Sequence, residues 1–194
     1  MFQARSVRMT RSCAGALRAG LVVVNVNPLY TPRELEHQLK ASGAKAIVIL
    51  ENFAATLQQV INAVPTKQVV LAAVGDMLGL LKGTLVNYVV RKVKKMVPAY
   101  GLPGAVRFND ALAEGRGKRY TTPAITLDDI AVLQYTGGTT GVSKGAVLLH
   151  RNLVANVLQS EAWYQPALKR IPSGEQVVTV CALPLYHIFG FTAN

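Results

Sequence analysis

The sequence is poor in cysteine and lacks any long uninterrupted apolar run, and each shortage excludes a class of protein. Its two cysteines, Cys13 and Cys181, form no Cys-x-x-Cys pair and have no histidine at metal-ligand spacing. This argues against a disulfide framework or a thiolate metal site and favours a reducing, cytoplasmic compartment. The longest apolar stretches are interrupted by Arg18, Lys82 or Arg91. None reaches the roughly 18–20 residues that span a bilayer.

Acidic residues are also scarce, which leaves the chain strongly basic. It has 10 Asp plus Glu against 21 Lys plus Arg, a net charge of +11, and no acidic residue precedes Glu34. Such an excess attracts nucleotides, acidic lipids or nucleic acids without choosing among them. Nucleic-acid binding has only this charge in its favour, because no groove pattern of alternating aromatic and basic residues is present. We therefore expect no nucleic-acid partner.

Apolar runs and helical patterns alternate through the first 74 residues. Short apolar runs at residues 21–27, 44–50 and 68–74 predict buried strands, and residues 31–42 and 52–64 predict the helices between them. Thr31 followed by Pro32 is a typical helix start, and Leu35 and Leu39 lie on one face of that helix. This order predicts an α/β fold with a mainly parallel sheet and flanking helices.

The segment Gly75–Val97 has the pattern of a basic amphipathic helix. Arg91, Lys94 and Lys95 lie on one helical face, and the other face is apolar: Leu78, Leu81, Leu85, Val89, Val93 and Met96. Two interpretations remain open. The apolar face packs in the core beneath a solvated basic face, or the helix lies on an acidic membrane surface.

The second half of the chain contains fewer clear elements. Residues 98–127 are rich in glycine and proline and predict loops with one short helix at 111–114. Strands are predicted at 128–135 and 146–149, a helix at 150–164, and a buried strand from 176 that breaks at Pro184. The sequence stops inside an apolar element, so we expect a fragment of a longer protein.

Between the strands at 128–135 and 146–149 lies the loop YTGGTTGVSKG, residues 135–145. It departs from the Walker pattern because Gly145, not Ser or Thr, follows Lys144, and because no helix follows. Its glycines can nevertheless aim several N–H groups at one anion, while hydroxyls and Lys144 add donors. The candidate phosphate-binding residues are Thr136, Gly137, Gly138, Thr139, Thr140, Gly141, Ser143, Lys144 and Gly145. The alternative is a polar hairpin loop without a ligand.

This loop resembles the phosphate loop of the acyl-adenylate-forming (AMP-binding) superfamily. The usual pattern is Tyr/Phe-Thr-Ser/Gly-Gly-Thr-Thr-Gly-x-Pro-Lys-Gly, and the chain departs from it at Ser143, where proline is usual. LPLYHIFG (residues 183–190) resembles the next motif of the family, and residues 17–49 resemble its opening βαβ unit. Gly137 is the variant associated with bacterial long-chain fatty acid CoA ligases. The resemblance covers residues 14–194 and leaves residues 1–13 unassigned.

The resemblance implies adenylation of a fatty acid by ATP, followed by transfer of the acyl group to CoA. It assigns Lys144 to the departing β- and γ-phosphates, His187 to the carboxylate at the acyl-pocket wall, and Tyr186 to the pocket wall or its packing. Residues 14–194 then form part of the N-terminal domain. The segments with the adenine pocket, the Mg²⁺-binding glutamate and the catalytic lysine are not in this sequence. We therefore name no catalytic or metal residue and expect no activity from the chain alone.

Other functions remain open on the sequence alone. An aryl- or medium-chain acyl-CoA ligase is the nearest enzyme alternative, because the acyl pocket lies mostly outside this sequence. A non-catalytic module that binds anions or a membrane surface is the alternative from another class. The expected location is the cytoplasm, with peripheral association with the inner face of the membrane if the basic helix binds lipid.

Overall fold

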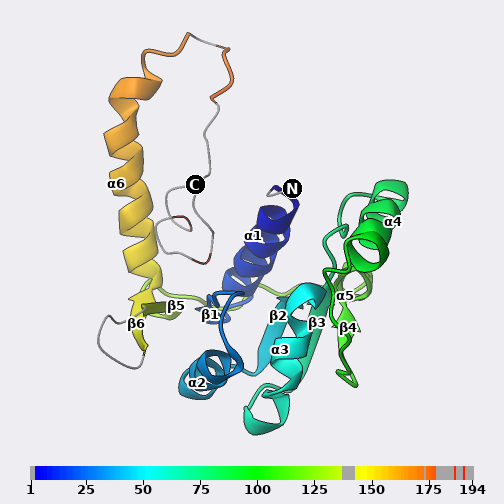
Figure 1. Ribbon diagram of the computed structural model, residues 1–194. Coiled ribbons are helices and arrows are strands. Elements are labelled where there is room, and N and C mark those ends of the chain that lie inside the picture. The colour runs from blue at the N-terminus through cyan, green and yellow to red at the C-terminus, as the bar shows by residue number, and fades with distance from the viewer. Residues whose placement is uncertain (1–2, 137–142, 173, 178–185, 187–189, 191–194) are drawn as a thin grey trace. The chain divides into compact units, whose positions relative to one another are not determined.

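The computed structural model describes residues 3–136, 143–172, 174–177, 186 and 190. The chain divides into two compact units (Figure 1): residues 1–12 with 26–122, and residues 13–25 with 123–194. Within the described residues, each contains one three-stranded sheet, in the order β2-β3-β4 in the first and β1-β5-β6 in the second. The α/β class predicted from the sequence is confirmed. No helix in the described part of the chain combines the length and hydropathy of a membrane span.

The sheet of the first unit is parallel throughout. It consists of β2 (Ala46–Leu50), β3 (Gln68–Ala72) and β4 (Val106–Arg107). Ala46 pairs with Gln68, and Val70 pairs with Val106. Strands β2 and β3 were predicted from their apolar runs. Strand β4 was not predicted, because its two residues lie in a stretch whose glycines and prolines predict a loop.

Helix α2 (Pro32–Ser42) begins and ends as its sequence predicts. The Thr31 hydroxyl accepts a hydrogen bond from the Glu34 backbone N–H, and the Glu34 carboxylate accepts one from the Thr31 N–H at 2.8 Å. This reciprocal capping box satisfies backbone donors that the first turn leaves without helical partners. Gly43 ends the helix with φ 65°, a left-handed conformation that glycine adopts without strain.

The connection from β2 to β3 is not the single helix predicted over 52–64. It comprises a 3₁₀ turn, η1 (Glu51–Phe53), the short α3 (Ala54–Gln58) and a second 3₁₀ turn, η2 (Ile61–Ala63). Its deeply buried residues, Ala54, Leu57 and Val60, lie three apart, a spacing closer to the 3₁₀ period than to the 3.6 of an α-helix. They share the core of this unit with side chains of α2, β2 and β3: Leu35, Leu39, Ile47, Val69 and Leu71.

The connection from β3 to β4 contains α4 (Leu80–Tyr88), which continues into the π-helical turn η3 (Val89–Val93). Most of the predicted apolar face is exposed: Leu81 is 86% and Leu85 64% exposed. The interpretation that this face packs in the core is therefore wrong. After β4, α5 (Phe108–Arg116) contains the short helix predicted at 111–114 and extends it at both ends.

The sheet of the second unit joins strands far apart in sequence. β1 (Val23–Val24) is parallel to β5 (Ile130–Thr136), with Val23 opposite Val132, and β5 is antiparallel to β6 (Lys144–Leu149). The sequence order predicted that β1 would share a sheet with β2 and β3. That prediction is wrong, because β1 pairs with β5 instead.

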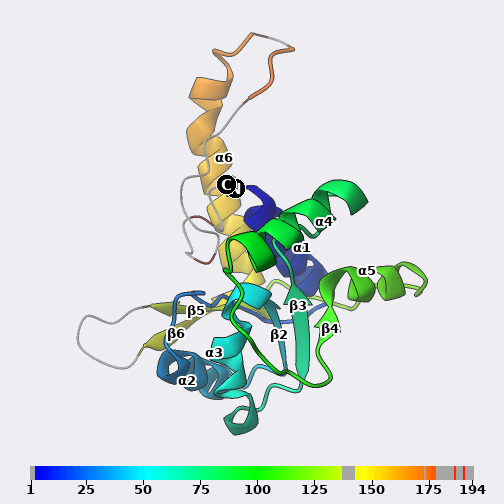
Figure 2. The same ribbon diagram turned by 45° about the vertical axis from the view of Figure 1, so that its right-hand side comes forward.

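Two long helices complete the described chain (Figures 1 and 2). α1 (Gln3–Arg18) was not predicted, and α6 (His150–Leu168) follows β6 directly, beginning at His150 as expected. No residue of α6 is buried, and its predicted apolar side is largely exposed, with Val157 51% and Leu158 59% exposed. The strand predicted from residue 176 onward lies mostly outside the described residues.

Candidate functional site

The two ends of the candidate phosphate loop are held together by the β5–β6 hairpin. The antiparallel ladder extends to the pairs Tyr135–Gly145 and Thr136–Lys144, so the strands close immediately before and after the loop. The Ser143 hydroxyl also donates a hydrogen bond to the Thr136 carbonyl oxygen at 2.9 Å. The strand pairs Tyr135–Gly145 and Thr136–Lys144, together with this hydrogen bond, therefore hold the strands together next to the loop. We call residues 135–136 and 143–145 the hairpin stem.

Only part of the predicted phosphate site can be placed. Thr136, Ser143, Lys144 and Gly145 belong to the hairpin stem. The remaining loop residues lie outside the described part of the chain: Gly137, Gly138, Thr139, Thr140 and Gly141. Their contribution to phosphate binding stays a prediction.

Thr136 and Lys144 face each other at the open end of the hairpin, and both are exposed. Directly opposed residues of an antiparallel pair project their side chains from the same face of the sheet. The Thr136 hydroxyl and the Lys144 ammonium group therefore lie on the same face of the sheet, directly next to the loop. The hydroxyl can donate one hydrogen bond and the ammonium three, which suits an anionic ligand.

Gly145 has a packing role that the sequence did not reveal. A Cβ atom at this position would lie 3.0 Å from Cε2 and 3.1 Å from Cζ of the Tyr135 ring on the opposite strand. The absence of a side chain therefore leaves space for the ring. Partial burial raises the pKa of the Tyr135 hydroxyl, so this group stays protonated at neutral pH.

Beneath the stem, a chain of polar contacts connects four segments of the second unit. The Cys13 thiol donates to Asn25 Oδ1 at 3.8 Å, and Asn25 Nδ2 donates to Gln134 Oε1 at 3.5 Å. Gln134 Nε2 then donates to the backbone carbonyl of Tyr186 at 3.2 Å. These contacts bring Tyr186 to the strand that leads into the phosphate loop.

Asn25 and Gln134 are buried, 5% and 8% exposed, and neither was among the predicted site residues. The sequence contained a signal: each is a polar residue inside an apolar, strand-forming run. Because a buried amide is costly without hydrogen-bond partners, such a residue indicates an organised polar contact. Of the two predicted acyl-pocket residues, Tyr186 is placed beside Gln134. His187 lies outside the described residues.

Cys13 has the environment of a packed, unreactive thiol. It is 8% exposed, and burial raises its pKa from the ordinary 9.0 to about 11. Among the described residues, no group of three or more His, Cys, Asp or Glu side chains could hold a metal ion.

Comparison with known proteins agrees with the loop and the fold. The family model of the AMP-binding enzyme matches residues 1–194. Two curated relatives are long-chain-fatty-acid–CoA ligases. That of Escherichia coli O157:H7 is 57% identical over 93% of this chain and 31% of its own length, and that of Haemophilus influenzae is 52% identical over 93% and 32%.

The fold also resembles that of ATP-bound MatB from Rhodopseudomonas palustris. The TM-score is 0.60 at 24% identity, over 96% of this chain and 30% of that one. At this identity the likeness concerns the fold alone. The chain spans about a third of the length of the relatives and of the solved structure that it matches.

Proposed function

The chain belongs to the AMP-binding enzyme family, and from this we propose that it supplies the phosphate-binding part of an ATP-dependent ligase that joins long-chain fatty acids to coenzyme A. The observation that carries the proposal is the hairpin stem, where the ladder pair Thr136–Lys144 closes the glycine- and threonine-rich loop. The identity to long-chain-fatty-acid–CoA ligases supports this acid class over aryl or medium-chain acids.

In the proposed reaction, a carboxylate oxygen of the fatty acid attacks the α-phosphorus of ATP. A new P–O bond forms, the bond to the bridging oxygen breaks, and pyrophosphate leaves. The sulfur of CoA then attacks the acyl carbon, the bond to AMP breaks, and the thioester forms. Thr139, Thr140 and backbone N–H groups of the loop hold the phosphates, and Lys144 orients the two that leave. Fixed donors of this kind lower the barrier by stabilising the charge on the departing group.

Tyr186 and His187 are proposed to line the acyl pocket near the carboxylate. The hydrogen bond from Gln134 to the Tyr186 carbonyl supports this for Tyr186, because it links that residue to the strand that enters the phosphate loop. The resemblance also implies Mg²⁺ and CoA. Since the described residues include no metal-binding cluster, no step is assigned to a metal.

Titration of the 194-residue chain with ATP, followed by calorimetry, tests the phosphate site. We expect binding that Lys144→Ala weakens at least about tenfold, because a charge-assisted hydrogen bond contributes about 1.5–3 kcal/mol. The exposed Lys169 on the segment after α6 is the matched control, and Lys169→Ala should leave affinity unchanged. Absence of ATP binding, or equal binding by Lys144→Ala, would overturn the proposal.

Catalysis is tested separately. We propose that the chain alone forms no AMP from ATP, CoA and a long-chain fatty acid. A chimera that joins this chain to the remaining part of the Escherichia coli O157:H7 ligase should form AMP from these substrates. Comparing long-chain, medium-chain and aromatic acids in that chimera distinguishes the acid classes. AMP formation by the chain alone would overturn the inactivity, and a preference for aromatic acids would overturn the long-chain assignment.

The second candidate is a non-catalytic module that binds anions or a membrane surface. It is favoured by the +11 net charge and by the exposed lysines at residues 92, 94 and 95. This candidate predicts that ATP affinity depends on total charge, so Lys144→Ala and Lys169→Ala would weaken binding equally. For either candidate we propose a cytoplasmic location, with peripheral association with the inner face of the membrane.

A further inference from the structure

The side-chain amide of Gln134 is buried, and all of its hydrogen-bonding groups have partners. The residue lies on β5, two positions before Thr136, and is 8% exposed. Its Oε1 accepts a hydrogen bond from Asn25 Nδ2 at 3.5 Å, and its Nε2 donates to the carbonyl oxygens of Tyr135 at 3.3 Å and Tyr186 at 3.2 Å. A primary amide has two N–H donors and one carbonyl oxygen, so these three contacts engage each of them.

The contacts allow the Gln134 amide one orientation. Turning the amide over would set its oxygen against two backbone carbonyl oxygens and its nitrogen against the Asn25 nitrogen. The Asn25 amide is oriented in turn by the Cys13 thiol, which donates to Asn25 Oδ1. Burial raises the pKa of Cys13 to about 11, so the thiol keeps the proton that it donates. The N–H groups of Gln134 therefore point in a fixed direction, toward the Tyr186 carbonyl.

The amide lies at the end of the sheet where the phosphate loop begins. Val24 pairs with Leu133 in the parallel ladder of β1 and β5, which places Asn25 beside Gln134 at the carboxyl ends of both strands. In α/β sheets, ligands bind outside the carboxyl ends of parallel strands. Because Gln134 is buried, it acts on a ligand at this edge through the residues that it holds.

We propose that Gln134 is a positioning residue for adenylation: its amide fixes the backbone at Tyr186 relative to the strand that enters the phosphate loop. The role rests on the proposed function, which assigns Tyr186 to the acyl pocket and the loop to ATP. Attack of the carboxylate on ATP requires the reacting atoms to lie about 3–3.5 Å apart, and a displacement of about 1 Å can cost about a hundredfold in rate. A hydrogen bond that spans 52 residues of sequence keeps this spacing.

An apolar side chain at position 134 could fill the same space but could not set this spacing. Apolar contacts are non-directional, and they would leave the Tyr186 backbone free to shift along β5. A fully satisfied buried polar network is directional and specifies one arrangement. The three contacts of Gln134 are such a network.

Fluorine NMR of the 194-residue chain, labelled with 3-fluorotyrosine, provides the test. The line that disappears in Tyr186→Phe belongs to Tyr186. Without ATP, Gln134→Met retains the side-chain length but no N–H donor, and the population with Tyr186 displaced should rise about two- to tenfold, the equilibrium effect of one net hydrogen bond.

ATP should shift the Tyr186 line in the original chain, because the hydrogen bond from Gln134 holds Tyr186 beside the strand that enters the ATP-binding loop. In Gln134→Met, ATP should bind with unchanged affinity in calorimetry, while the shift of the Tyr186 line is lost. A variant that only lowers stability would not separate these two measurements.

Val132→Ala is the matched control. Val132 is fully buried on the same strand, so the change lowers stability but removes no contact of the Gln134 amide. It should retain both the Tyr186 line and its shift with ATP. Gln134→Asn is the second test variant, because its amide is one methylene shorter and its donors no longer reach the Tyr186 carbonyl. It should behave like Gln134→Met and keeps a polar side chain in the buried site.

Three outcomes would overturn the proposal. The first is an equal ATP shift of the Tyr186 line in the original chain and in Gln134→Met. The second is loss of the shift in Val132→Ala as well, which would make reduced stability its cause. The third is ATP binding to the original chain without any shift of the Tyr186 line, which overturns the positioning role and leaves the proposed phosphate site intact. Absence of ATP binding would instead overturn the proposed function, and with it the role of Gln134.

Discussion

The side-chain amide of Gln134 donates a hydrogen bond to the backbone carbonyl of Tyr186 at 3.2 Å, across 52 residues of sequence. The same nitrogen also donates to the carbonyl of Tyr135 at 3.3 Å, at the end of the strand that enters the phosphate loop. One buried amide therefore joins the two motifs that the sequence identified separately. Its importance for the second unit can be measured.

Replacing Gln134 with leucine removes these contacts while retaining most of the side-chain volume. We expect the free energy of unfolding to fall by about 1–2 kcal/mol, because the amide of Asn25 and the carbonyl of Tyr186 lose a partner. Urea denaturation measures the change. Gln59→Leu is the control, since Gln59 is exposed and its side chain donates to the Ala55 carbonyl one helical turn earlier. Equal stability of both variants would show that the Gln134 contacts contribute nothing.

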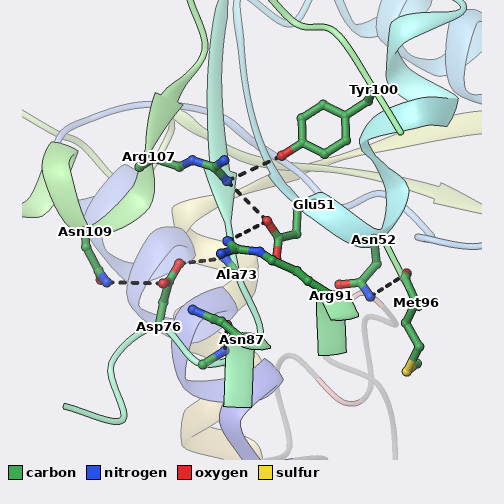
Figure 3. A network of polar contacts seen from close by, with 11 residues as sticks. Glu51, Asn52, Ala73, Asp76, Asn87, Arg91, Met96, Tyr100, Arg107 and Asn109 are labelled. Carbon is green, nitrogen blue, oxygen red and sulfur yellow. Dashed lines mark hydrogen bonds and ion pairs between the residues drawn. The ribbon is translucent and has the colours of Figure 1, made fainter. Parts of the chain in front are cut away.

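Glu51→Gln tests the ion pair between Glu51 of η1 and Arg91 of η3 (Figure 3). Removing one partner of a fully buried pair costs about 3–5 kcal/mol. Arg91 and Arg107, however, are 39% and 49% exposed and can regain water. We therefore expect a smaller loss of about 2 kcal/mol in the free energy of unfolding, from the weakened charge-assisted hydrogen bonds.

The control for Glu51 is Glu36→Gln, which breaks the exposed pair with Lys40 within α2. Such surface pairs contribute about 0.3–0.5 kcal/mol, so denaturant unfolding of this variant should differ little from that of the original chain. A Glu51→Gln variant no less stable than Glu36→Gln would contradict the structural role of the buried pair.

Gly145→Ala tests the contact between Gly145 and Tyr135. The new methyl group meets the Tyr135 ring, and overpacking of this kind costs about 1–3 kcal/mol. Alanine is less flexible than glycine when unfolded, which offsets about 0.5–1 kcal/mol. We expect a net loss of about 1 kcal/mol, measured by thermal unfolding.

Gly115→Ala in α5 is the matched control, because no described atom beyond its chain neighbours and its own helix backbone lies within 4 Å of the added Cβ position. It should stabilise the chain by about 0.5 kcal/mol through helix propensity. Without the ring, in a Tyr135→Ala background, Gly145→Ala should no longer lower stability and should keep only the gain of about 0.5–1 kcal/mol. If Gly145→Ala still lowers stability when residue 135 is alanine, contact with the ring is not the cause of the loss.

The raised pKa of Cys13 predicts slow thiol chemistry. At pH 8, a thiol with a pKa of about 11 has roughly a hundredfold less thiolate than one at its ordinary value. In a Cys181→Ser background, the native chain should therefore react with a chromogenic disulfide at least about a hundredfold more slowly than the same chain in guanidinium chloride. Equal rates would show that Cys13 is accessible.

The raised pKa of Cys13 also makes the stability of the chain depend on pH. Because folding raises the pKa of Cys13, the native state holds this proton more tightly than the unfolded state. Its contribution to stability is complete below pH 9 and is lost as the pH rises toward about 11. The stability difference between the original chain and Cys13→Ala should therefore shrink between pH 8 and pH 10.5 in urea denaturation. A constant difference would contradict the shift.

Features encoded within a few neighbouring residues could be read from the sequence. The capping box of Thr31 and Glu34, the burial of Leu35 and Leu39, and the strands β2, β3, β5 and β6 depend on local chemistry and on apolar periodicity. The phosphate loop belongs to the same class, because its glycines, threonines and lysine are consecutive. They sufficed to indicate the family.

Only the tertiary structure decided which segments meet and which faces they use. The pairing of β1 with β5, the hydrogen bond from Gln134 to Tyr186 and the ring of Tyr135 over Gly145 join residues whose contact no local pattern specifies. The leucines of α4 show most clearly what sequence periodicity cannot predict. Their spacing predicted an apolar face, but the small residue Gly83 and the pair of Arg91 with Glu51 fixed the opposite face inward. Periodicity shows that a helix has two faces, and only packing determines which one is buried.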